Sequence, residues 1–279
     1  METSTNKTHI MLKKSITIIG GGNLGISITN GLLKAAYVSP ENITVTRRNL
    51  QAIISLKEKG INLTSDNCQA VKNSDIIFIA VKPQQVAGVL KEISAVLDPS
   101  RHIIISLVAG MSLEKTENLI GINNITLFHA IPNTAIAVQE SMTCIASKNE
   151  SEEQKKEVSG IFNQLGKVMF IDEELMGAAT VLGSCGTAFA LRFIRAAAEG
   201  GVQMGFEADI AHFIAAQTLK GAASLVLENN SHPEAEIDKV TTPKGITITG
   251  LNEMEHQGLS SSVISGIMAA FNKMEQSKK

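Results

Sequence analysis

Ile16-Thr17-Ile18-Ile19-Gly20-Gly21-Gly22-Asn23-Leu24-Gly25 is the stretch that decides the fold. Its first four residues form an apolar, β-branched run that predicts a strand, and a helical pattern through Leu24–Ala36 follows. Between strand and helix, Gly20, Gly22 and Gly25 fit the spacing G-x-G-x-x-G. In that context the first glycine permits a tight turn, the second lets the backbone approach a pyrophosphate, and the third lets helix and strand pack closely. The turn therefore predicts that a dinucleotide binds at a helix N-terminus.

The pattern of a strand followed by a helix continues downstream: short β-branched runs alternate with helical stretches from Ser15 to about Ile171. Further strands are predicted at Ile43–Thr46, Asp75–Ala80, His102–Ser106, Thr126–Ala130 and Met142–Ala146. These runs are apolar throughout rather than alternating, which is typical of strands covered on both faces in a parallel sheet. The alternation predicts an α/β, Rossmann-type doubly wound domain over residues 15–172.

The second half of the chain, residues 173–279, is predicted to be an all-helical domain. The segment Leu175–Leu227 is rich in Ala, Gly, Leu and Phe and contains no convincing strand. Within it, Thr187–Ala198 is apolar around most of a helix, with only Arg192 and Arg195 charged. Such a helix must be buried on most sides. The burial could come from an ordinary helical bundle or from a subunit interface, and the small size of the domain favours an interface in a homodimer.

Composition narrows the class of protein. The chain has 279 residues, a formal net charge of -2 and 44% hydrophobic residues, which is typical of a soluble globular protein. There is no basic cluster for nucleic acid, no metal-ligand spacing among the six histidines, and no uninterrupted apolar run near the roughly 20 residues of a membrane span. Three scattered cysteines predict a reducing, cytoplasmic location. Residues 1–14 are polar at their start and are predicted to be a disordered extension.

The end of the second predicted strand indicates which dinucleotide binds. An NAD site usually has an acidic residue there, but this chain has Arg47 and Arg48 after Thr46. Two guanidinium groups suit a 2′-phosphate, so NADPH is favoured, with NADH as an alternative. The competing interpretation is a pair of solvated surface arginines.

Several runs further along the chain resemble, in order, the motifs of the pyrroline-5-carboxylate reductase family. The resemblance covers Ser15 to the C-terminus, and it includes Asn67 and the loop that the family usually writes V-T-S-P-G-G-T-T. The matching runs here are Ala80-Val81-Lys82-Pro83-Gln84, Ser106-Leu107-Val108-Ala109-Gly110, Pro132-Asn133-Thr134, Gln217-Thr218-Leu219-Lys220-Gly221-Ala222 and Val240-Thr241-Thr242-Pro243-Lys244-Gly245-Ile246-Thr247.

The resemblance implies an NADPH-dependent enzyme that reduces the cyclic imine 1-pyrroline-5-carboxylate to L-proline. It also implies a homodimer, with a larger ring of dimers as a further option. The implied cofactor site comprises Ile19, Gly20, Gly21, Gly22, Asn23, Leu24, Gly25, Arg47, Arg48, Asn67, Ala80, Val81, Lys82, Pro83, Leu107, Val108 and Ala109. The implied substrate site comprises Glu173, Thr242, Lys244, Gly245, Ile246 and Thr247, and no metal is expected.

The resemblance implies roles for two of the substrate residues. The Thr247 hydroxyl could hydrogen-bond the imine nitrogen, which makes it the candidate catalytic residue; the alternative is a plain N-terminal helix position. Glu173 could lie near the substrate or could be a solvated carboxylate at a helix start.

Departures from the family pattern leave other functions open. Lys244 and Ile246 replace small loop residues, Thr187 replaces a proline, His129 an arginine and Gly177 an aspartate. One alternative is a reductase of another small imine or oxo acid on the same fold, although a β-hydroxyacid dehydrogenase would need a lysine that Leu175–Gln217 lacks. A second alternative is a catalytically impaired paralogue that still binds NADPH.

Overall fold

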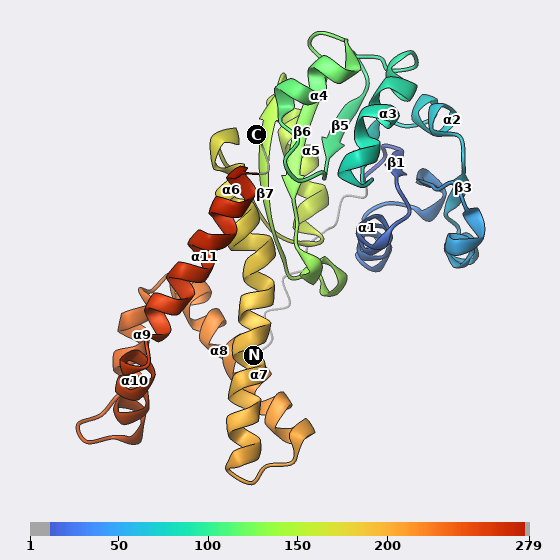
Figure 1. The fold of residues 1–279 in the computed structure, drawn as a ribbon. Coiled ribbons are helices and arrows are strands. Elements are labelled where there is room, and N and C mark those ends of the chain that lie inside the picture. The colour runs from blue at the N-terminus through green and yellow to red at the C-terminus, as the bar shows by residue number, and fades with distance from the viewer. Residues whose placement is uncertain (1–11, 277–279) are drawn as a thin grey trace. The chain divides into compact units, whose positions relative to one another are not determined.

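The computed structural model describes residues 12–276, which form two compact units: one ends at Ser184 and the other begins at Cys185 (Figure 1). Residues 173–184, which the sequence analysis assigned to the helical domain, pack on the first unit. Met176 and Val181 are buried, and the Asn133 side chain donates to the Gly183 carbonyl at 3.0 Å.

The first unit contains a single eight-stranded sheet in the order β3-β2-β1-β4-β5-β6-β7-β8. All neighbouring strands are parallel except β6 and β7, which are antiparallel, so the sheet is mixed rather than fully parallel. Two strands, β3 and β8, were not predicted. The strands are β1 Ile16–Ile19, β2 Ile43–Thr46, β3 Asn62–Thr64, β4 Ile76–Ile79, β5 Ile103–Ser106, β6 Thr126–Ile131, β7 Ser141–Lys148 and β8 Gly166–Phe170.

Helices cover both faces of the sheet and create two hydrophobic cores. One core is packed by α1 and α5, and the other by α2, α3, α4 and α6. This three-layer arrangement is the doubly wound fold that the sequence predicted. The helices are α1 Asn23–Lys34, α2 Asn67–Lys72, α3 Pro83–Ser94, α4 Leu113–Ile120, α5 Glu152–Asn163 and α6 Met176–Ala179, with short 3-10 helices at Pro40–Asn42, Leu50–Lys59, Thr134–Val138 and Glu173–Leu175.

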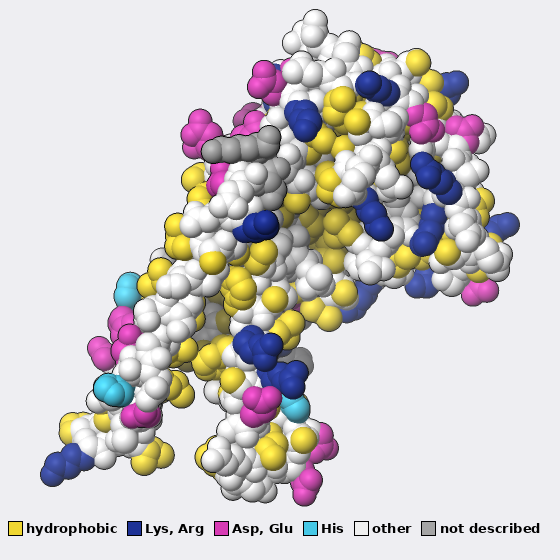
Figure 2. All heavy atoms as spheres, viewed as in Figure 1, with side chains coloured by type: hydrophobic (Ala, Val, Ile, Leu, Met, Phe, Trp, Pro, Cys, Tyr) yellow, Lys and Arg dark blue, Asp and Glu magenta, His cyan; other side chains and the backbone are white. Residues whose placement is uncertain are grey.

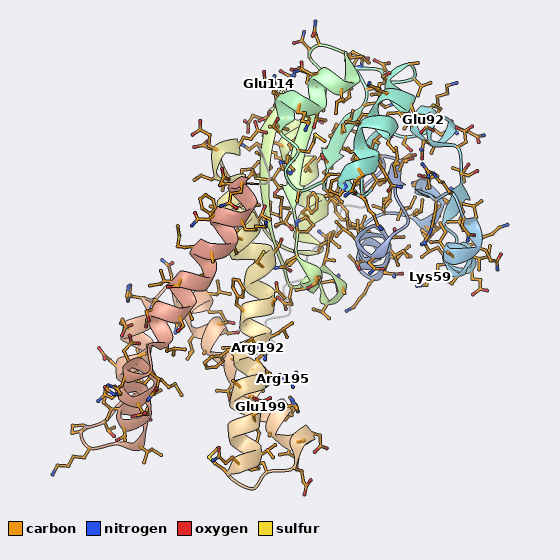
Figure 3. All side chains as sticks on the ribbon, viewed as in Figure 1. Lys59, Glu92, Glu114, Arg192, Arg195 and Glu199 are labelled. Carbon is orange, nitrogen blue, oxygen red and sulfur yellow. The ribbon has the colours of Figure 1, made fainter. Side chains whose placement is uncertain are left out.

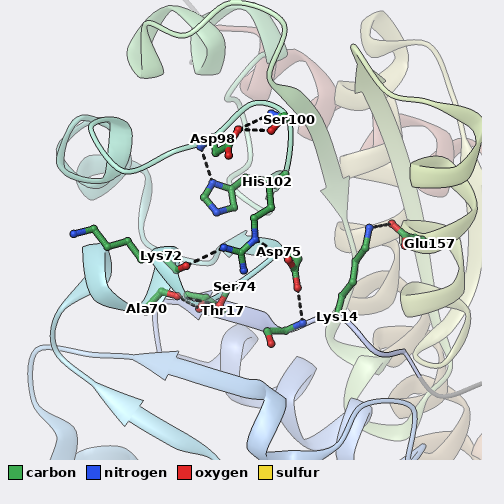
Figure 4. Close-up of polar contacts among 12 residues, drawn as sticks. Lys14, Thr17, Ala70, Lys72, Ser74, Asp75, Asp98, Ser100, His102 and Glu157 are labelled. Atoms are coloured by element: carbon green, nitrogen blue, oxygen red, sulfur yellow. Dashed lines mark hydrogen bonds and ion pairs between the residues drawn. The ribbon is translucent and has the colours of Figure 1, made fainter.

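Polar contacts fix the amino-terminal ends of the central strands (Figure 4). The Asp75 carboxylate accepts hydrogen bonds from the Ser15 backbone N–H at 2.9 Å and from Arg101 Nε at 2.8 Å. Lys14 pairs with Glu157 of α5 at 2.7 Å, and Leu12 is buried. The predicted disordered extension therefore overlaps with ordered structure at Leu12–Lys14; its remaining part, residues 1–11, lies outside the described residues.

The second unit is helical, as predicted. A π-helical turn, Thr180–Cys185, leads into α7 Gly186–Gln203, and the unit continues with α8 Ala208–Asn229, α9 Pro233–Val240, α10 Ile246–His256 and α11 Leu259–Gln276. Helices α7 and α8 pack closely where Gly201 meets Ala211, since a Cβ on Gly201 would lie 3.0 Å from the Ala211 Cβ.

Large hydrophobic side chains remain exposed along these helices (Figure 2). In α7, Leu191 is 60% exposed and Phe193 is also exposed, so the unit does not bury this helix as a bundle core would. By length and composition, Glu173–Gln203 and Ala208–Asn229 could cross a membrane. The sequence analysis looked for uninterrupted apolar runs and did not single out these two segments, because polar residues interrupt both of them.

Candidate functional site

The glycine turn lies between β1 and α1 at the carboxyl edge of the sheet. Gly20 has a φ of +114°, and a Cβ there would collide with the Ala80 carbonyl. A Cβ on Gly25 would collide with the Gly20 carbonyl. By contrast, Gly22 is exposed with nothing near its absent side chain, and as the N-cap of α1 it provides no side-chain acceptor for the first N–H groups. The turn therefore presents open space and free N–H donors, as an approaching pyrophosphate requires.

The end of β2 is tied to this turn. The Gly20 and Gly21 N–H groups donate to the Thr46 carbonyl at 3.2 and 2.9 Å, and Arg47 Nη1 donates to the Gly21 carbonyl at 2.6 Å. Arg48 is exposed and makes no hydrogen bond or ion pair with residues 12–276. Arg47 thus braces the turn, while Arg48 is available to a phosphate.

Asn67 begins α2 beside the end of β2 and is held from two sides. Its Oδ1 accepts from Thr46 Oγ1 at 2.6 Å, and its Nδ2 donates at 3.1 Å to the carboxylate of Glu92. Glu92 belongs to α3 (Figure 3). Glu92 was not predicted as part of the site. It lies on an exposed helix face, and no sequence signal connects it to Asn67.

The ends of β4 and β5 supply the remaining predicted cofactor residues. The Ala80 N–H donates to the Ile19 carbonyl at 2.8 Å, which places Ala80–Pro83 beside the glycine turn. Lys82 and Pro83 are exposed at the start of α3, and Val81 is half-buried. Leu107 and Val108 are buried, while Ala109 is exposed. The structure brings the whole predicted cofactor set to one edge of the sheet, where doubly wound domains bind dinucleotides.

The predicted substrate loop belongs to the second unit and opens α10. Its Gly245 N–H donates to the Thr242 carbonyl at 2.9 Å, and Lys244 has a φ of +60°, which gives the loop the features of a type II turn with lysine at the position that favours glycine. Gly245 is the N-cap and offers no side chain, so the first N–H groups of α10 are free for an anion. Ile246 and Thr247 are exposed in the first turn.

Glu173 belongs to the first unit, where it has a structural partner. Its Oε1 accepts a hydrogen bond from the Leu113 N–H at 2.5 Å, at the N-terminus of α4. A carboxylate is favoured there by the helix dipole. This contact accounts for the residue without a substrate.

Two family models match the chain, one in each half. Residues 15–110 match the model described as NADP oxidoreductase, coenzyme F420-dependent, and residues 173–277 match pyrroline-5-carboxylate reductase dimerisation. Among relatives, pyrroline-5-carboxylate reductase 2 of Dictyostelium discoideum is 44% identical, covering 97% of this chain and 95% of the relative. The pyrroline-5-carboxylate reductase of Methanosarcina acetivorans is 34% identical, covering 95% and 98%.

Solved structures agree over almost the whole chain. The Plasmodium falciparum pyrroline carboxylate reductase with NADP bound is 27% identical, with a TM-score of 0.86 over 96% of this chain and 100% of that one. The Coxiella burnetii pyrroline-5-carboxylate reductase is 29% identical, with a TM-score of 0.88 over 95% and 98%.

Proposed function

We propose that this chain, which belongs to the pyrroline-5-carboxylate reductase family, uses NADPH to reduce 1-pyrroline-5-carboxylate to L-proline. The observation that carries the proposal is the joint presence of a complete dinucleotide edge in the first unit and the Thr242–Thr247 loop in the second. Bound NADPH supplies the hydride for the imine carbon.

The chain's own residues bind and orient the cofactor and the substrate. The glycine turn and the free N–H groups of α1 receive the pyrophosphate, and Arg47 and Arg48 receive the 2′-phosphate. The open N-terminus of α10 suits the substrate carboxylate, because its N–H groups and helix dipole both favour an anion. Thr247 in that turn donates a hydrogen bond to the imine nitrogen, which takes its proton from water as the ring carbon receives the hydride.

The direct test is oxidation of NADPH by the purified protein with a panel of cyclic imines. We expect 1-pyrroline-5-carboxylate to be the preferred substrate, ahead of six-membered ring imines and imines that lack the carboxylate. A preference for another imine would point to the alternative substrate that Lys244 and Ile246 leave open. NADPH binding without any turnover would identify a catalytically impaired paralogue.

Replacing Thr247 with valine tests the catalytic assignment. The change keeps the side-chain shape and removes the hydroxyl, so kcat/KM for the imine should fall about 10- to 1000-fold, as for other transition-state donors. NADPH affinity should not change, because the cofactor site lies in the first unit. Unchanged kinetics with a slightly lower melting temperature would make Thr247 purely structural.

The proposal includes a homodimer, because the exposed apolar face of α7 lies within the matched dimerisation model. A protein partner also accounts for the two helices of membrane-spanning length, so no membrane is invoked. A cytoplasmic location agrees with the three free cysteines, and the net charge of -2 offers no attraction for nucleic acid. A ring of dimers is a further option that sedimentation would reveal.

A further inference from the structure

His129 is a buried polar side chain that the proposed function does not use. It is 4% exposed, and neither ring nitrogen meets hydrogen-bond geometry with a partner among residues 12–276, although the Val108 carbonyl lies near enough to favour a protonated ring. Buried polar groups in folded proteins almost always have partners, so an orphaned imidazole calls for a specific explanation.

Strand register places His129 beside a second buried polar group. His129 of β6 is aligned with Ser106 of β5 on one side and with Ala146 of β7 on the other. Residues aligned on neighbouring strands project to the same face, and the strands are about 5 Å apart. The Ser106 side chain is therefore the polar neighbour nearest in register to the imidazole.

Ser106 in turn contacts the segment that follows β5. Its Oγ accepts a hydrogen bond from the Val108 N–H at 3.4 Å, and Ser106 itself is 2% exposed. A hydroxyl also carries one proton to donate. No acceptor for that proton is found within residues 12–276, and a neutral imidazole one strand away has a free acceptor nitrogen.

We propose that Ser106 and His129 form a hydrogen-bonded pair that positions the nicotinamide-binding segment Leu107–Ala109. The Ser106 hydroxyl donates to a ring nitrogen of His129 through one buried water, since the two side chains make no direct hydrogen bond, and it accepts from the Val108 N–H. His129 is thus a positioning residue that acts through Ser106. The inference rests on the proposed cofactor site but not on the identity of the imine.

The surroundings keep the imidazole in the neutral form that the pair needs. Burial lowers the pKa of His129 to about 4, although the Val108 backbone favours the charged form in part. The sheet neighbours Ser106 and Ala146 carry no charge, and α6 consists of Met176, Gly177, Ala178 and Ala179. On α4, which packs on β6, Glu114 and Lys115 are exposed, and Glu117 pairs with Lys148 at the surface. Glu173 and Glu174 precede α6, and the Glu173 carboxylate is bound to Leu113.

A double-mutant cycle on NADPH affinity tests the pair. The variants are Ser106→Ala, His129→Phe and the combination, with NADPH binding followed by nucleotide fluorescence in the absence of imine. We expect each single change to weaken binding roughly three- to tenfold, the size of one hydrogen bond, and the combination to be no worse than the weaker-binding single variant. His129→Gln, whose amide oxygen can accept the same proton, should restore most of the affinity. Additive effects, or unchanged binding in His129→Phe, would refute the pair.

Nuclear magnetic resonance of the unmodified protein provides a test that does not depend on a variant folding. We expect the ring nitrogens of His129 to show one neutral tautomer, with one nitrogen accepting a hydrogen bond, at pH 6–8. A charged ring or two unbonded nitrogens would overturn the proposal. Because no imine is present in these experiments, their interpretation does not depend on which imine is the substrate.

Discussion

The two units of this chain solve the problem of burying apolar surface in opposite ways. The sheet unit encloses two hydrophobic cores, and every residue of both cores precedes Cys185. Among the helical residues that the structure describes, up to Gln276, only the small ones Ala198, Gly201 and Ala211 are buried, and most of the exposed large hydrophobic side chains lie on the helices of this unit. The first unit encloses its own cores and contains the residues of the proposed cofactor site. The second has an exposed apolar surface of the kind that a protein partner covers.

The largest expected effect comes from placing a charge on the helical surface. Leu191→Asp puts a carboxylate on the exposed face of α7, where it would be buried without a counter-ion in the dimer. The dimer dissociation constant should rise about 100-fold or more, and activity should fall with it. Sedimentation velocity at micromolar concentration measures the change.

Met169→Asp is the matched control in the sheet unit. Met169 is 54% exposed on the edge strand β8, so a charge there stays in water and the dimer should persist. If Leu191→Asp remained an active dimer as well, the contrast between the units would be wrong. NADPH binding should survive in both variants, because the cofactor residues lie within one unit.

Within the sheet unit, two glycines should respond differently to the same change. Gly20→Ala places a Cβ against the Ala80 carbonyl at a φ of +114°, which should cost about 2–4 kcal/mol of unfolding free energy and most NADPH binding. Gly22→Ala meets open space, so its stability should stay within about 0.5 kcal/mol. NADPH affinity should nevertheless fall, since the added methyl obstructs the pyrophosphate. Chemical denaturation measures the change in unfolding free energy, and fluorescence titration measures the change in NADPH affinity. Equal losses of stability in the two variants would contradict the prediction.

The two arginines after β2 should also be separable. Charge-assisted hydrogen bonds contribute about 1.5–3 kcal/mol each, so removing both Arg47 and Arg48 should raise the NADPH KM about tenfold or more. Arg48→Ala should affect NADPH alone, whereas Arg47→Ala should also weaken NADH binding, because Arg47 holds the Gly21 carbonyl. Steady-state kinetics with both cofactors test this. An unchanged ratio of NADPH to NADH preference in the double variant would remove the arginines from 2′-phosphate recognition.

The smallest expected effect concerns backbone strain in the helical unit. Lys244 has a left-handed backbone, so Lys244→Gly should stabilise the protein by about 0.5–1 kcal/mol after allowing for the flexibility of glycine when unfolded. Lys220→Gly is the matched control in the middle of α8, where glycine should destabilise by about 1 kcal/mol. Thermal melts at one fixed protein concentration should show a higher melting temperature for Lys244→Gly and a lower one for Lys220→Gly. A lower melting temperature for Lys244→Gly would show that backbone strain at this position is not the dominant effect.

Much of the fold could be predicted because buried strands have a clear signature. Ile76–Ile79 and Ile103–Ser106 are covered on both faces and appear in sequence as continuous apolar runs. The edge strands β3 and β8 were missed, since Asn62–Thr64 is short and Gly166–Phe170 alternates between exposed and half-buried residues. The antiparallel turn to β7 was also missed, although the connection from Ile131 to Ser141 is too short for a parallel crossover.

Site residues could be predicted where neighbouring residues in the sequence identify them. Those that come together only through strand pairing could not. The glycine turn is recognisable from the spacing of its glycines, and the Arg47–Arg48 pair from its position directly after a predicted strand. Asn67 came only from the family resemblance, and its partner Glu92 looks like any exposed helical carboxylate. The Ser106–His129 alignment exists only once β5 and β6 are paired, so no pattern along the chain could reveal it.

The order of the strands along the chain also bears on how the protein is made. All eight strands lie between Ile16 and Phe170, so the sheet can form on the ribosome while the helices after Cys185 are still being translated. The helical half has to meet a second polypeptide before its apolar faces are covered. Its maturation is therefore a bimolecular event whose rate depends on expression level, and the interval before that encounter is when the newborn chain is most exposed to chaperones, proteases and aggregation.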